Sequence, residues 1–128
     1  MNNIYVSGSI KKVMILALLL MPIKVYALTQ DQFCNDLSSK TASGIMMYKI
    51  SGRSESEVRS MTAKAVAEMR VESADAPKVL GIPKYFELLD LSMDLVITTT
   101  YFDADITQEK RKMIIKELCL GPKISSYF

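Results

Sequence analysis

Three acidic side chains are spaced so that they fall on one side of a helix. Glu87, Asp90 and Asp94 follow one another at three- and four-residue steps, which match the period of a helix. Such a stripe could bind a cation or a basic partner surface, or take part in acid–base catalysis. The simpler interpretation is a solvated helix face opposite an apolar one.

The residue types that the sequence lacks restrict its chemistry further. It contains no histidine and two cysteines, Cys34 and Cys119. This excludes Ser-His-Asp and Cys-His nucleophiles and the usual zinc ligand sets. A segment from Asp103 resembles the start of a calcium loop, but Gln108 and Ile114 stand where an EF-hand needs glycine and glutamate. We therefore predict a protein that is not an enzyme and that has no cofactor and no metal site.

The last predicted helix is locally basic, with Lys110, Arg111, Lys112 and Lys116. Lys112 and Lys116 are four residues apart, as in a docking strip for an acidic partner. The simpler interpretation is an outer face whose cations lie toward the helix C-terminus, where the macrodipole favours them. The candidate partner-binding residues are therefore Glu87, Asp90, Asp94, Lys112 and Lys116.

Residues 1–27 are typical of a secretory signal peptide. Two lysines precede an apolar run over residues 13–23, and Val25 and Ala27 fit the small-residue pattern before a cut. A transmembrane helix needs about 20 apolar residues, whereas this run ends before Lys24. The alternative is an uncleaved N-terminal anchor. A lipoprotein is less favoured, because the residues before the first cysteine are polar.

Removal of residues 1–27 changes the charge of the protein. Three of the 16 basic residues and none of the 14 acidic ones lie there, which leaves a net charge of −1. A near-neutral domain gives no electrostatic argument for binding nucleic acid, and we expect membrane attachment only if residues 1–27 are retained. In an oxidising compartment Cys34 and Cys119 are expected to pair. We predict a periplasmic or secreted protein with this disulfide.

Hydrophobic periodicity and capping signals predict four helices, at about residues 30–51, 55–72, 84–101 and 108–120. Residues 28–128 would then form a single all-α domain, a small four-helix antiparallel bundle after an N-terminal signal helix. In that topology the start of the first helix and the end of the fourth lie at the same end. A bridge between Cys34 and Cys119 fits this arrangement.

Local signals place most of the helix boundaries. Thr29 and Ser54 each begin a capping-box pattern. Residues 73–83 contain two prolines and a glycine and are predicted to be a loop. Residues 95–102 are rich in β-branched and aromatic side chains, so a strand is the alternative there. The length of the periodic pattern favours a helix.

The last predicted helix begins at a cap formed by Thr107 or Asp105 and ends before a Gly-Pro pair. Its predicted inner face consists of Ile114, Ile115, Leu118 and Cys119.

The chain resembles a loose group of short exported proteins that are common in proteobacteria and sometimes occur on mobile elements. The resemblance covers most of residues 30–120 and rests on Cys34, "YKISGRSESEV", "SMDLVITTTYFDADIT" and "KELC". It implies an α-helical periplasmic domain with a Cys34–Cys119 bridge, and it implies no activity, since none is established for the group. The segment from Glu72 to Pro83 departs from the tightest version of the pattern.

The leading hypothesis is an exported, non-enzymatic helical domain that binds another protein. This class includes immunity and inhibitor proteins of the periplasm. One alternative is a cell-envelope or stress factor held by an uncleaved N-terminal segment. Another is a small enzyme that uses the carboxylates of Glu87, Asp90 and Asp94. The sequence does not identify the partner.

Overall fold

The computed structural model describes residues 27–102 and 106–128, so all of the predicted signal peptide except Ala27 lies outside it. Within this part of the chain every regular element is a helix, which confirms the all-α prediction. The elements are α2 (Gln30–Asp36), η2 (Leu37–Thr41), α3 (Ala42–Ile50), α4 (Glu55–Glu72), α5 (Ala76–Leu80), α6 (Tyr85–Phe102), α7 (Gln108–Cys119) and α8 (Pro122–Ser125).

Side-chain caps fix the starts of three long helices. The Thr29 hydroxyl accepts a hydrogen bond from the Gln32 amide at 3.1 Å, and the Gln32 side chain accepts one from the Thr29 amide at 3.0 Å. Ser54 and Glu57 form the same reciprocal pair at the start of α4. Both predicted capping boxes are confirmed. Of the two caps proposed for the last helix, the Thr107 hydroxyl accepts from the Lys110 amide at 3.1 Å.

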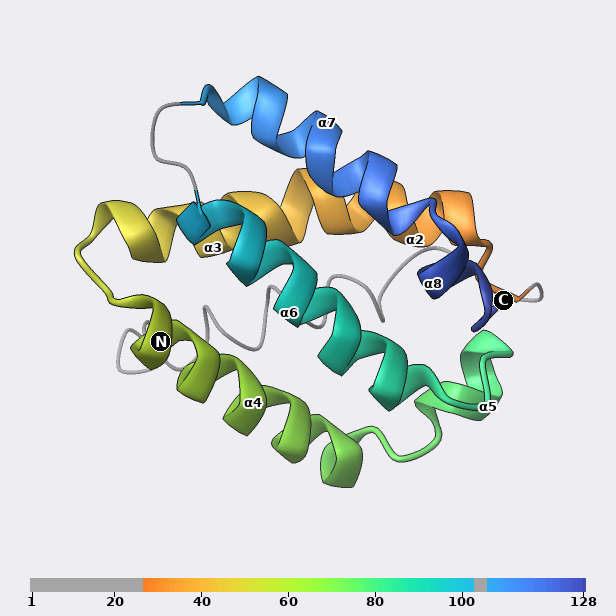
Figure 1. The fold of residues 1–128 in the computed structure, drawn as a ribbon. Helices are drawn as coiled ribbons and strands as arrows, with labels where there is room; N and C mark the ends of the chain where they lie inside the picture. Colours follow the sequence, from red (N-terminus) through yellow and green to blue (C-terminus); the bar gives the residue numbers. More distant parts are fainter. Residues whose placement is uncertain (1–26, 103–105) are drawn as a thin grey trace, which may run out of the picture.

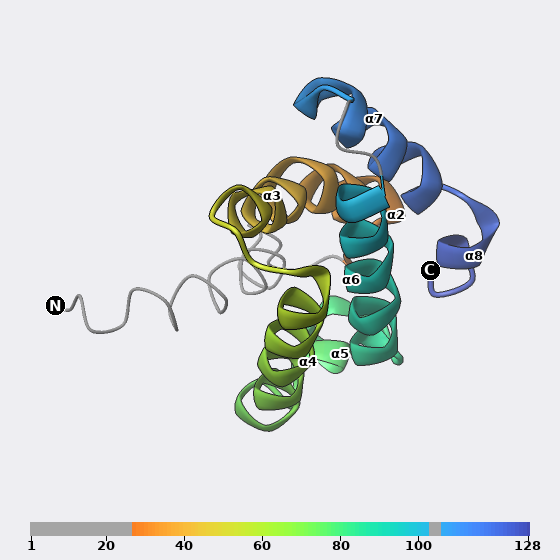
Figure 2. The same cartoon turned by 60° about the vertical axis from the view of Figure 1, so that its left-hand side comes forward.

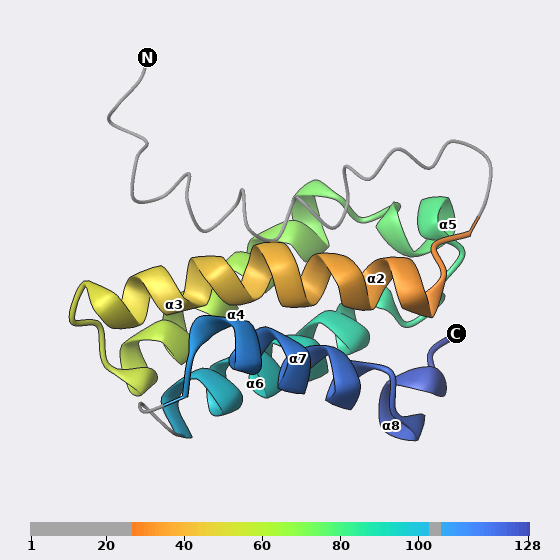
Figure 3. The ribbon, with the colours of Figure 1, turned by 90° about the horizontal axis from the view of Figure 1, so that it is seen from above.

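The first helix is continuous from Gln30 to Ile50 (Figure 3) but contains a π-helical turn, η2, at its middle. In an α-helix the Asn35 carbonyl would accept the Ser39 amide. Here the Ser39 hydroxyl donates to that carbonyl at 2.7 Å and the Ser38 hydroxyl at 3.2 Å. This competition for the carbonyl favours the wider turn, in which the Ala42 amide reaches back to the Leu37 carbonyl. The π turn was not predicted from the sequence.

Helix α6 occupies the centre of the fold and packs against α3, α4 and α7. Figures 1 and 2 show α4 and α7 on opposite sides of α6, with α7 lying across the first helix. Successive long helices run in alternating directions (Figure 1). The central position explains why α6 is buried along most of its length, from Tyr85 to Thr100. The helical interpretation of residues 95–102 is confirmed, since α6 continues to Phe102.

The sequence predicted a loop over residues 73–83, and this prediction is wrong in part. The segment contains the five-residue helix α5. Its proline, Pro77, lies in the first turn, where the missing amide costs no hydrogen bond. Gly81 ends the helix with a φ of 73°, a conformation that glycine adopts without strain. Leu80 and Ile82 are buried on either side of this glycine.

A disulfide joins Cys34 in α2 to Cys119 at the end of α7, with a Cα–Cα distance of 5.6 Å, as predicted. The Gln30 side chain strengthens the same junction, since it donates to the Cys119 carbonyl at 3.0 Å and accepts from the Ser125 hydroxyl at 2.9 Å. The aromatic ring of Phe128 lies 5.8 Å from that of Phe33. The two ends of the domain are therefore fastened together by covalent, polar and apolar contacts.

Candidate protein-binding surface

Two of the three predicted acidic residues form ion pairs between α4 and α6. Asp90 accepts from Arg70 at 2.8 Å, and Asp94 accepts from Arg59 at 2.6 Å. Arg59 also contacts Glu55 at 3.0 Å. The hydrogen bond that Arg59 donates to Asp94 is the main reason that the pKa of Arg59 is raised. These carboxylates are more than half exposed, so the pairs add little stability. They do link the two helices.

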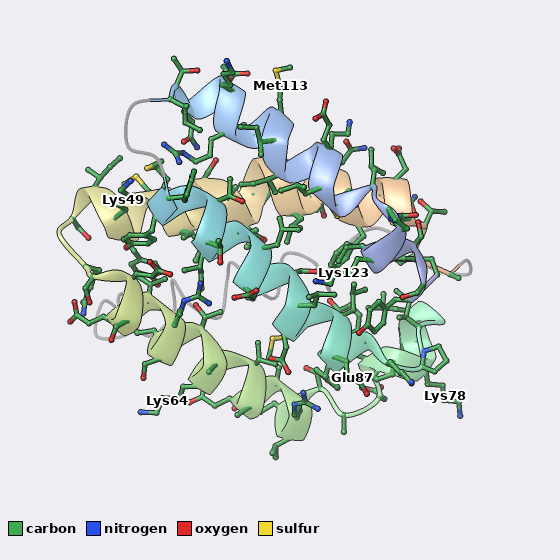
Figure 4. All side chains as sticks on the ribbon, viewed as in Figure 1. Lys49, Lys64, Lys78, Glu87, Met113 and Lys123 are labelled. Atoms are coloured by element: carbon green, nitrogen blue, oxygen red, sulfur yellow. A yellow bond between two sulfur atoms is a disulfide. The ribbon has the colours of Figure 1, made fainter. Side chains whose placement is uncertain are left out.

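Glu87, the third acidic residue, is exposed on α6 toward its N-terminal end (Figure 4). It forms no ion pair with another described residue. A shallow hollow of about 240 Å³ between α4 and α6 is lined by Asp90 and Asp94 but not by Glu87. The three carboxylates thus share a helix face but not a cavity, and two of them already have arginine partners.

Lys112 and Lys116 are half-buried on α7, a different helix from the acidic stripe. Neither forms an ion pair within residues 27–102 and 106–128. The structure therefore does not bring the five predicted residues together into one surface. Nor does any group of three or more histidine, cysteine, aspartate or glutamate side chains among the described residues lie close enough to hold a metal ion.

A larger groove, of about 420 Å³, runs between α6 on one side and α7 with α8 on the other. We call it the α6–α8 groove. Its apolar lining comes mainly from Leu91, Leu95, Leu118, Pro122 and Ile124. Leu118 was predicted to face the core, but its side chain is 51% exposed. The error has a simple cause, since α7 buries Arg111, Ile115 and Cys119 at four-residue steps and this turns Leu118 toward the groove.

The lining of the α6–α8 groove includes charged groups of both signs. Asp94 and Glu117 contribute carboxylates, and Lys123 contributes an ammonium group. Figure 4 shows Lys123 between α8 and α6 and shows Met113 on the opposite, outer side of α7. Asp94 is paired with Arg59, whereas Glu117 forms no ion pair with a described residue. The groove therefore combines an apolar lining with one carboxylate that forms no ion pair with a described residue.

A second hollow, of about 380 Å³, lies where α3 ends near the start of α7 and is lined by Met46, Lys49, Ile50, Ile106, Gln108 and Arg111. Both cationic side chains that line it donate hydrogen bonds to main-chain carbonyls of α6. The Lys49 ammonium donates to the Thr100 carbonyl at 2.9 Å. The Arg111 guanidinium donates to the Thr99 and Thr100 carbonyls at 3.1 Å each. Both cations therefore cap the C-terminal end of α6 and serve the fold.

No protein-family model, no curated protein and no solved structure matches this chain. The described helices include none that is long and apolar enough to cross a membrane.

Proposed function

We propose that this protein is an exported, non-enzymatic domain that binds another protein through the α6–α8 groove. The observation that carries the proposal is the exposure of leucine side chains along a concave surface. Leu118 is 51% exposed, and Leu91 and Leu95 are half-buried one helical turn apart. Apolar grooves with a few polar groups at their rim are the usual sites for a partner's amphipathic helix.

The charges of the groove define the chemistry of the partner. Two carboxylates and one ammonium group line it, and the unpaired carboxylate is that of Glu117. We propose that the partner presents an amphipathic helix. Its apolar side chains would enter between α6 and α8, and a lysine or arginine would face Glu117. Opposite charge at the rim favours the correct orientation and faster association.

The scaffold suits this role because it is held rigid. In our proposal the antiparallel four-helix arrangement carries the groove, with the disulfide holding α7 against α2 and Gln30 holding the α7–α8 junction. A preformed groove loses less conformational entropy on binding than a flexible one. Docking would therefore not require the domain to reorganise.

The disulfide and the composition of residues 1–27 support export to the periplasm or beyond. A small, stapled and exported domain that docks a single helix suits an immunity or inhibitor protein, and we place the protein in that class. The proposal makes no use of Glu87, Asp90 and Asp94 as catalytic groups. Arginine partners occupy two of these carboxylates, which favours a structural role over acid–base chemistry.

The test places a photo-crosslinking amino acid at Leu118 in cells that export the protein at near-native abundance. A matched protein carries the same amino acid at Met113, which is 64% exposed on the outer side of the same helix. We expect one discrete crosslinked partner from position 118 and none from position 113. The crosslinked partner segment, made as a peptide, should bind the wild-type domain and lose at least about tenfold in affinity with Leu118→Arg, as expected of an interface centre. Met113→Arg should leave binding unchanged.

Three results would contradict the proposal. Equal crosslinking at both positions would indicate non-specific contact. Absence of any crosslink at 118 would leave the groove without a partner. A crosslink between two copies of this chain would replace the proposed partner with self-association.

A further inference from the structure

The residue that follows the predicted leader, Leu28, belongs to the folded core. Its side chain is 2% exposed. Its main-chain amide donates to the Leu80 carbonyl at 3.0 Å. Thr29, the next residue, is the N-cap of α2. The backbone is therefore fixed by named contacts from residue 28 onward.

The residue on the other side of the predicted cut, Ala27, is packed against the end of α5. A Cβ atom added to Gly81 would lie 2.8 Å from the Ala27 Cβ and 3.4 Å from its Cα. Only a residue without a side chain allows this approach, and the φ of 73° at Gly81 requires glycine for a second reason. Ala27 is otherwise exposed. Both residues of the 27–28 peptide bond thus contact the segment from Leu80 to Gly81.

These contacts conflict with proteolysis of the folded chain. A peptidase binds several residues on each side of the bond in an extended form, so the segment around it must detach from the domain first. Detachment here would expose Leu28, break its bond to Leu80 and disturb the cap at Thr29. The bond is therefore available to a peptidase before the α5 segment folds against it and is protected afterwards.

We propose that the order of two events, leader removal and folding of the α5 segment, decides which form of this protein exists. The inference rests on the expectation that residues 1–27 are a leader cut after Ala27, and it does not depend on the α6–α8 groove. Hydrolysis consumes one water molecule and yields the Ala27 carboxylate and the Leu28 ammonium. After folding, that ammonium keeps the hydrogen bond to the Leu80 carbonyl that the amide makes now.

The order in which residues leave the translocation channel during export gives a physical reason for cleavage to precede folding. Residue 28 leaves the translocation channel well before residues 80 and 81, so the peptidase meets the junction while its docking site is still absent. A chain that folds before it is cut keeps residues 1–27 and, with them, an apolar segment. The cleaved and the uncleaved anchored form are then two outcomes of one kinetic competition.

The test uses the full chain, residues 1–128, folded with its disulfide formed and presented to a bacterial leader peptidase in detergent micelles. The same chain, reduced and alkylated with iodoacetamide and checked by circular dichroism for loss of its helices, serves as the unfolded reference. We expect the reference to be cut after Ala27 at least about tenfold faster than the folded chain, since cleavage follows the population of the opened form. Intact mass identifies the product that begins at Leu28.

Two matched variants test the junction itself. Gly81→Ala places a methyl group against Ala27, whereas Gly52→Ala introduces the same kind of backbone strain, at a φ of 93°, with nothing within 4 Å. We expect Gly81→Ala to speed cleavage of the folded chain by at least about threefold over Gly52→Ala, since only Gly81→Ala loosens the junction. Circular dichroism and a thiol assay confirm that both variants are folded and oxidised.

Each opposite result overturns the inference. Equal rates for the folded and alkylated chains would show that the junction is not protected. Equal rates for the two glycine variants would show that Gly81 does not hold it. If neither form is cut after Ala27, this bond is not a processing site, and the groove proposal still stands on its own test.

Discussion

The guanidinium of Arg111, on α7, donates a hydrogen bond to the main-chain carbonyl of Thr100 in the last turn of α6 at 3.1 Å. The side chain is 2% exposed. It also donates to the carbonyls of Thr99 at 3.1 Å and Ile106 at 3.3 Å. A buried arginine thus replaces the water that would otherwise satisfy the free carbonyls at a helix end. It also places positive charge at the negative end of the α6 dipole.

We predict that Arg111→Met lowers the free energy of unfolding by at least about 2 kcal/mol, because hydrogen bonds to a charged donor are lost and buried carbonyls lose their partner. The free energy of unfolding of Arg111→Lys should lie between those of the wild type and Arg111→Met, since lysine keeps the charge but not the forked set of donors. Urea unfolding followed by far-UV circular dichroism measures the change. Lys110→Met, at an exposed position on the same helix, is the control. Equal stabilities for Arg111→Met and Lys110→Met would disprove the capping role.

Arg111 also shows where prediction from sequence ends. The pattern of the last helix placed this arginine with Lys110 and Lys112 on an outer basic face, because arginine is rarely buried. Arg111 can be buried because its guanidinium donates hydrogen bonds to main-chain carbonyls of α6. The spacing of residues within α7 carries no information about those carbonyls. Leu118 was misplaced for the same reason, since the true inner stripe of α7 begins with Arg111.

Helix limits could be predicted because their causes are local. Capping side chains at Thr29 and Ser54 lie within three residues of the amides they satisfy, and all four long helices match their predicted limits to within one residue. Cys34 and Cys119 could be paired because only two cysteines exist. The partners of Asp90 and Asp94 could not be predicted, because cross-helix ion pairs depend on how α4 lies on α6.

The buried phenol of Tyr85 should make the free energy of unfolding depend on pH in the alkaline range. Burial raises the pKa of its phenol well above the ordinary value of 10.0, and the hydroxyl has no hydrogen-bond partner among the described residues. The unfolded chain releases this proton near pH 10 while the folded chain retains it. Stability contributed by this group is therefore constant below that pH and falls above it, by at most about 1.4 kcal/mol per pH unit.

Tyr85→Phe should reduce this alkaline loss. At neutral pH it should also leave stability unchanged or slightly higher, because it removes a buried hydroxyl without a partner. Part of the slope should remain, since burial also raises the pKa values of Tyr48 and Tyr101. Urea midpoints between pH 8 and pH 11.5 measure both effects, with the range set by the ordinary tyrosine pKa of about 10. An identical alkaline slope in the variant would show that Tyr85 is not the group responsible.

The ion pairs between α4 and α6 are expected to make a small contribution to the free energy of unfolding. Asp94→Asn should lower stability by about 0.2–1 kcal/mol at low ionic strength, and the loss should shrink in about 1 M salt, because the pair with Arg59 is exposed and is screened by ions. Glu87→Gln is the matched control on the same helix face. It should change stability less at both salt concentrations, since no described residue pairs with Glu87. A loss that persists unchanged at high salt would indicate a packing effect in place of an electrostatic one.

The disulfide should contribute the largest single share of stability. Its cysteines are separated by 85 positions, and closing a loop of this size restricts the unfolded chain by about 4–5 kcal/mol in the chain-entropy description. We expect the Cys34→Ala/Cys119→Ala double variant to unfold at much lower urea than the wild-type protein. Both sulfur atoms are fully buried, so reductant alone should act slowly on the native protein and quickly in urea. Rapid reduction without urea would show that the bridge is accessible in the native protein. A double variant as stable as the wild type would show that the polar and apolar contacts alone hold the first and last long helices together.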